Sequence, residues 1–148
     1  MNILPDFFPD APRGGVSVYT TVLVRYRDID AFNHVNNAVY LSYLEQARIE
    51  YFAEMAGNTW DWDEYGAIVA RNEIDYLRPV HLGDKVKICT WCADVGRSSM
   101  KIAYQIFAKT SENQDWMVVA KAETIIVAYN LSQKKVVPVH ESWATRLA

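Results

Sequence analysis

A segment rich in large apolar residues, and free of glycine and proline, runs from residue 38 to residue 56 and constrains the fold most. Apolar side chains recur every three or four residues along it, at Tyr40, Leu44, Ala47, Tyr51 and Met55. This spacing predicts a helix with an apolar stripe. Further large apolar residues widen the stripe, and so wide an apolar face has to be covered by the rest of the chain. The sequence therefore predicts a long, buried central helix.

A polar turn comes immediately before this helix. Asp28 and Asp30 open it, and His34, Asn36 and Asn37 follow. Asparagine is a preferred N-cap residue, so we expect the helix to begin near Asn36 or Asn37. An acidic side chain then lies a few residues before the unpaired N–H groups and the positive dipole end of a helix. Such an arrangement can serve acid–base chemistry.

The remaining segments alternate between strand-like and turn-like composition. Strands are predicted at 16–26, 66–79, 85–95, 100–109 and 116–129, a short extended piece at 136–139 and a helical turn at 140–147. One strand, one long helix and then a series of neighbouring strands predict an α+β fold, with an antiparallel sheet against the helix.

The length of 148 residues predicts a single domain over residues 1–148, with an extended N-terminal arm at 1–15 and a C-terminal tail at 131–148. A net charge of −3 gives no electrostatic reason to expect nucleic acid binding. The sequence has no apolar run long enough for a membrane span and no secretory signal pattern.

Two cysteines, Cys89 and Cys92, have the C-x-x-C spacing of redox or metal sites. They lie in a predicted strand, where residues three apart point to opposite faces. We therefore expect buried or half-buried free thiols and a cytoplasmic location.

The pattern R-x-x-D-x-D-x-x-x-H-V-N-N-x-x-Y-x-x-Y-x-E-x-A-R spans Arg25 to Arg48. In this pattern the chain resembles the hotdog-fold thioesterases of the 4-hydroxybenzoyl-CoA thioesterase and bacterial acyl-CoA thioester hydrolase type. The resemblance implies a hotdog fold, in which a curved antiparallel five-stranded sheet wraps one long central helix. It also implies hydrolysis of acyl-CoA thioesters by a homodimer or homotetramer with sites between subunits.

Within that family the catalytic acid is the second of the D-x-D pair, which falls on Asp30, as general base or nucleophile. Asp28 is expected to have a structural role, such as capping the turn. Without the resemblance, Asp30 would be interpreted as a turn-stabilising residue. His34 and Asn37 are further catalytic candidates, and the amides of Asn36, Asn37 and Ala38 are the expected oxyanion hole.

Substrate contacts are expected from Tyr40 and from the segment Arg97-Ser98-Ser99, which resembles the part that relatives use for the nucleotide. Glu45 and Arg48 lie three residues apart on the predicted helix and are expected to form an ion pair. A second branch of hotdog thioesterases carries its acid on the central helix, so Glu45 is the reserve catalyst.

Several other classes of site lack their motifs. The sequence contains no G-x-S-x-G, no phosphate-binding glycine loop and no H-E-x-x-H, and its three histidines are scattered. We expect no metal and no cofactor. Two alternatives stay open: a hotdog module that binds acyl-CoA without turnover, and a thioesterase acting on acyl-carrier-protein substrates. A hotdog dehydratase is disfavoured because its different catalytic motif is absent.

Overall fold

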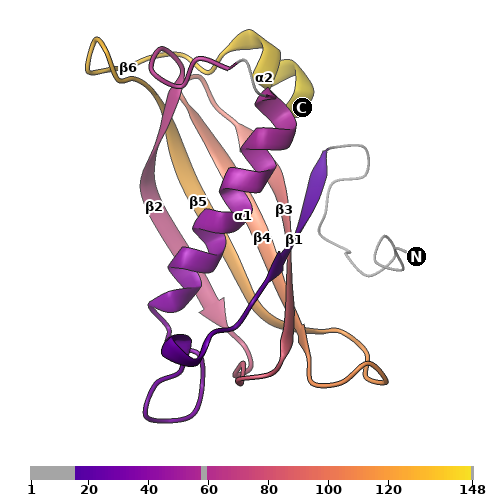
Figure 1. Ribbon diagram of the computed structural model, residues 1–148. Coiled ribbons are helices and arrows are strands. Elements are labelled where there is room, and N and C mark those ends of the chain that lie inside the picture. Colours follow the sequence, from indigo (N-terminus) through magenta and orange to yellow (C-terminus); the bar gives the residue numbers. More distant parts are fainter. Residues whose placement is uncertain (1–15, 58–59, 148) are drawn as a thin grey trace.

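The computed structural model describes residues 16–57 and 60–147. Figure 1 shows a twisted sheet with one long helix lying across one of its faces. In chain order the elements are β1 (Ser17–Val22), the 3-10 turn η2 (Tyr26–Asp28), α1 (Val39–Ala56), β2 (Gly66–Tyr76), β3 (Lys85–Val95), β4 (Ser99–Lys109), β5 (Met117–Asn130), β6 (Lys135–Val136) and α2 (Glu141–Leu147). The arm predicted for residues 1–15 lies outside the described residues.

The strands follow the order β1-β3-β4-β5-β2, and every neighbouring pair is antiparallel. The two-residue strand β6 pairs with the end of β5, so the sheet has six strands, one more than expected. The predicted α+β class and hotdog arrangement are confirmed. In the described part of the chain, β1 and β2 form the two edges of the sheet.

Several predicted boundaries were wrong by a few residues, among them those of the first two strands and of the helix. β1 ends at Val22 rather than at residue 26, because the chain turns into η2 once the Arg25 N–H donates to the Asp28 carboxylate. β2 ends at Tyr76, where the next two amides, of residues 77 and 78, both donate to the Val119 carbonyl. The helix begins at Val39, later than Asn36 or Asn37.

A β-bulge in β2 changes which side chains face the helix. The register with β5 shifts between Val69 and Arg71, so Ala70 is an extra residue. Ala67 and Val69 line a depression with α1 before the bulge, whereas Ile74 and Tyr76 do so after it. Strict alternation, which would put all the even-numbered residues of β2 on one face, therefore fails in the first part of the strand.

Both faces of the sheet are partly buried. The main core lies between α1 and the sheet, and a smaller cluster of Cys89, Trp91, Ala103 and Phe107 is separate from it. Cys92 belongs to the main core and Cys89 to the smaller cluster, so the expected opposite orientation of two buried, free thiols is confirmed. Among the described helices, none has the length and apolar character of a membrane span.

Candidate active site

Asp28 is a buried acidic group that joins the polar turn to the helix. Only 1% of the residue is exposed, and its carboxylate accepts hydrogen bonds from the Arg25 N–H (2.9 Å), the Arg25 guanidinium (3.0 Å) and the Tyr43 hydroxyl (2.8 Å). Burial alone would raise the pKa of Asp28, but the donors stabilise the charged form and lower the pKa overall. The predicted capping of the turn by Asp28 is confirmed.

Asp30 lies at the start of a tight loop and is half-buried. Its Oδ1 accepts a hydrogen bond from the Phe32 N–H at 2.9 Å, which closes an Asx turn. Its Oδ2 accepts no hydrogen bond within the described residues. The side chain therefore stabilises the loop with one oxygen and has the other available.

The loop folds back on itself, so that Asp30 and the start of the helix belong to one compact unit. The Asp30 N–H donates to the His34 carbonyl and the Asn36 N–H donates to the Asp28 carbonyl, both at 2.9 Å, and Ile29 forms an antiparallel bridge with Val35. This short ladder fixes the path of the chain from the acidic pair to the helix.

The side chain of Asn36 caps the turn that precedes the helix, not the first turn of the helix itself. Its Oδ1 accepts from the Ala38 N–H and its carbonyl accepts from the Val39 N–H, both at 2.9 Å. Two of the three amides expected to form an oxyanion hole, those of Asn36 and Ala38, are thus engaged. The Asn37 N–H has no acceptor among the described residues, so it is the available donor of the three.

An open depression of about 330 Å³ lies beside this amide, between α1 and β2. Its lining residues are Asn37, Ala38, Leu41, Asn72, Ile74 and Tyr76. The Tyr76 hydroxyl donates to the Asn37 carbonyl at 3.0 Å, and the Tyr76 ring meets the Tyr40 ring edge-on at 5.0 Å. Tyr40 itself is 2% exposed, and burial raises its pKa to about 12. Tyr40 therefore lies beneath Tyr76, which lines the depression.

His34 is half-buried and contacts a second histidine that the sequence did not bring to notice. The rings of His34 and His81 meet edge-on with centroids 5.1 Å apart, and the backbone N–H of His81 donates to the Asp84 carboxylate at 2.8 Å. His81 belongs to a turn far along the chain, and no sequence spacing relates it to His34. Tyr76 was missed for the same reason.

The segment Arg97-Ser98-Ser99 lies at the opposite end of the molecule. Its carbonyls accept from the C-terminal part of the chain, that of Arg97 from the Val139 N–H and that of Ser98 from the Ala128 N–H. Through β5, Tyr76 is level with Ile106 of β4, so seven residues of β4 separate it from Ser99. At ~3.3 Å per residue, Tyr76 and Ser99 are roughly 23 Å apart along the strands. A single copy does not bring them together.

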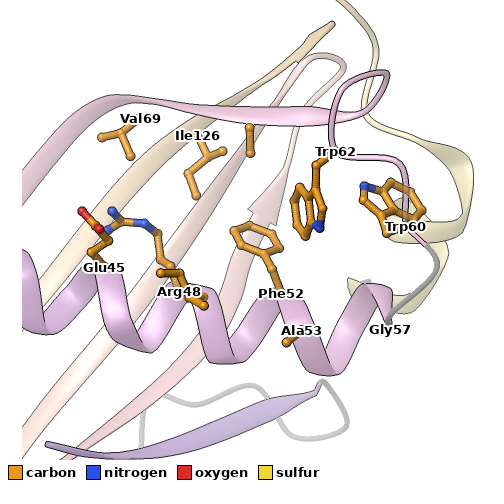
Figure 2. A pocket seen from close by; sticks show the side chains of 11 residues that line it. Glu45, Arg48, Phe52, Ala53, Gly57, Trp60, Trp62, Val69 and Ile126 are labelled. Atoms are coloured by element: carbon orange, nitrogen blue, oxygen red, sulfur yellow. The ribbon is translucent and has the colours of Figure 1, made fainter. Parts of the chain in front are cut away.

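The expected ion pair between Glu45 and Arg48 is absent from the described residues. Arg48 instead donates to the Tyr104 hydroxyl at 3.3 Å, and Glu45 is exposed at one end of a second depression (Figure 2). That prediction was wrong because a buried hydroxyl lies within reach of the guanidinium. Across the described residues, no cluster of three or more His, Cys, Asp or Glu side chains could hold a metal ion.

The model of the Thioesterase-like superfamily matches residues 24–147. A long-chain acyl-CoA thioesterase of Escherichia coli, FadM, is 32% identical over 117 residues, which are 78% of this chain and 86% of FadM. Alignments with three curated relatives, FadM among them, span 59%, 86% and 57% of those proteins' own lengths.

Solved structures agree on the fold. A Thermus thermophilus thioesterase, crystallised with coenzyme A and Zn, is 37% identical with a TM-score of 0.72, over 87% of this chain and 95% of that one. A 4-hydroxybenzoyl-CoA thioesterase has a TM-score of 0.78 at 15% identity, over 89% of this chain and 99% of that one. At that identity the second likeness concerns the fold.

Proposed function

Because the chain belongs to the Thioesterase-like superfamily, we propose that it hydrolyses acyl-CoA thioesters with Asp30 as general base or nucleophile. The family match confirms that the chain is a thioester hydrolase, as the motif predicted. The catalytic roles of individual residues are part of the proposal. The observation that carries it is that one folded loop bears both an available Asp30 oxygen and an available Asn37 amide. The FadM relative and the coenzyme A complex support acyl-CoA as the substrate class.

The reaction needs three functions at the thioester carbonyl. Asp30 removes a proton from the attacking water, or attacks the carbonyl carbon directly. The Asn37 N–H stabilises the oxyanion, an interaction typically worth about 3 kcal/mol. The C–S bond then breaks, and the departing CoA thiolate takes a proton, for which His34 is the candidate acid in the loop. In the direct route, water subsequently hydrolyses the acyl-aspartate.

We also propose that the site is completed by a second copy of the chain. β2 is an eleven-residue edge strand with Ile68 and Val69 about 40% exposed, and such an edge favours pairing. Two-fold antiparallel pairing of β2 with its copy reverses one protomer relative to the other. The end bearing Arg97 in the partner then lies at the same end as Asp30, where its guanidinium can bind a CoA phosphate.

The central test is the substitution Asp30→Asn, measured by thiol release from acyl-CoA. The asparagine oxygen can still accept from the Phe32 N–H, so the Asx turn and the melting temperature should be preserved. We expect kcat/KM to fall about 100-fold or more. Asp61→Asn is the matched control, because Asp61 also closes an Asx turn, with the amides of residues 63 and 64. Equal activity in wild type and Asp30→Asn would refute the role of Asp30.

The dimer has a separate test. Light scattering should give twice the 17.0 kDa chain mass for the wild type, and Ile68→Lys on β2 should give the monomer mass. Leu23→Lys, at an 80% exposed position outside β2, is the control that should stay dimeric. Thioesters of acyl carrier protein are the alternative substrate for the same assay. We propose a cytoplasmic location from the two free, buried cysteines.

A further inference from the structure

A second depression, of about 540 Å³, lies between the C-terminal half of α1 and the first half of β2 (Figure 2). We name it the α1–β2 groove. Its lining residues are Glu45, Arg48, Ile49, Phe52, Ala53, Gly57, Trp60, Trp62, Ala67, Val69 and Ile126. The volume falls within the range of small-molecule binding sites.

The groove is polar at one end and apolar along the rest. Glu45 and Arg48 are its charged residues and lie together at one end in Figure 2, whereas Phe52 and the two tryptophans lie toward the other. Three of its apolar side chains are exposed without a described cover: Ile49 (61%), Trp62 (40%) and Val69 (40%). Concave apolar surface of this kind marks a site that binds an apolar group.

The far wall of the groove is held in place by α2. The buried ring of Trp143 stacks on Phe52 with centroids 5.1 Å apart and on Trp60 at 4.7 Å. The Trp62 ring meets Phe52 edge-on at 6.0 Å, and the Trp60 Nε1–H donates to the Tyr65 carbonyl. The wall is therefore preformed, and a ligand need not order it on binding.

The position of the groove relative to the candidate active site limits what can reach it. Both depressions lie between α1 and β2. Glu45, at the near end of the groove, is eight residues after Asn37, or about 12 Å along the helix axis at ~1.5 Å per residue. Within one copy, a short acyl group bound with its carbonyl at Asn37 stays outside the groove, whereas a long flexible chain enters it.

We propose that the α1–β2 groove binds the hydrocarbon chain of a medium- or long-chain aliphatic acyl thioester, with the chain end against Phe52 and Trp62. The inference rests on the proposed function and specifies its substrate. It makes Ala53 and Trp62 determinants of chain length. The competing occupant is a side chain of a second copy, since β2 borders the groove.

The experiment measures kcat/KM for butanoyl-, dodecanoyl- and hexadecanoyl-CoA. We expect the wild type to have a higher kcat/KM for dodecanoyl-CoA than for butanoyl-CoA. Ala53→Phe, which fills the groove, should lower the ratio of these two kcat/KM values about tenfold or more, because one methylene in an apolar pocket already changes kcat/KM by roughly tenfold or more. Glu50→Phe adds the same ring at an exposed α1 position outside the groove and should leave the ratio unchanged. Trp62→Ala should shift the preference toward hexadecanoyl-CoA.

A wild type that favours butanoyl-CoA, or a ratio unaltered in Ala53→Phe, overturns the inference while the hydrolase function stands. A monomer mass for Ala53→Phe with an unaltered ratio would assign the groove to the second copy. Failure to hydrolyse any acyl-CoA would refute the proposed function instead. The groove is then tested by calorimetry with CoA thioethers. Tighter binding of the dodecyl than the butyl compound, lost in Ala53→Phe, supports it, and equal binding overturns it.

Discussion

The hydroxyl of Tyr43 donates a 2.8 Å hydrogen bond to the buried carboxylate of Asp28, which ties the turn before α1 to the helix itself. The same carboxylate accepts from the Arg25 backbone and side chain. Position and orientation of the Asp30 loop therefore depend on a group that is itself removed from solvent. Asp28 therefore contributes to the candidate site by fixing the loop that carries Asp30.

Removing this support should destabilise the fold. Tyr43→Phe deletes one donor to a buried charge, and we expect a loss of about 1.5–3 kcal/mol in the free energy of unfolding. Asp28→Asn also deletes the partner of Arg25; because the Arg25 side chain is 50% exposed, the loss should lie near the lower end for buried pairs, about 3 kcal/mol. Denaturant titration measures both. Losses below about 0.5 kcal/mol, the level of ordinary surface substitutions, would contradict this role.

The contribution of Asp28 should also depend on pH. Its pKa in the folded protein lies below the ordinary value of 3.8, so folding favours the charged form. The stabilisation is then complete above the unfolded-state pKa and is lost as the pH falls through the folded-state pKa. Unfolding free energies of wild type and Asp28→Asn should differ by a constant amount near pH 7 and converge in acid. A difference that grows on acidification would show that the sign is wrong.

The central helix and most strands were predictable because their signals are local. The period of Tyr40, Leu44, Ala47, Tyr51 and Met55 follows from helix geometry, and all five are buried. The opposite orientations of Cys89 and Cys92 follow from strand alternation and are confirmed in the same way.

Features that depend on tertiary contacts were not predictable. The bulge at Ala70 reverses the alternation of β2 without a glycine or proline to indicate it. Arg48 bonds Tyr104, 56 positions away, in place of its helical neighbour Glu45. At the candidate site, Asp30 came from a motif, but the available amide at Asn37 follows from how Asn36 uses its own side chain. The roles of Asp30, His34 and Asn37 stay predictions.

The two cysteines should be unreactive while the protein is folded. Burial raises the pKa of Cys89 and that of Cys92 to about 11 each. At pH 8 only about one thiol in a thousand is then the reactive thiolate. We expect negligible alkylation of the native protein over minutes and complete alkylation in denaturant, followed by mass spectrometry. Rapid labelling of the folded chain, or a disulfide between the two residues, would contradict this expectation.

The Asn37 N–H can be tested apart from the Asn37 side chain. The bond from the Val39 N–H to the Asn36 carbonyl closes a turn in which Asn37 is the second residue, a position that favours proline. Asn37→Pro therefore removes the backbone donor within a compatible turn, whereas Asn37→Ala removes only the side chain. If the amide stabilises the oxyanion, kcat should fall about 100-fold or more in Asn37→Pro relative to Asn37→Ala. If the two variants have equal melting temperatures and equal kcat values, the oxyanion hole must be formed by other groups.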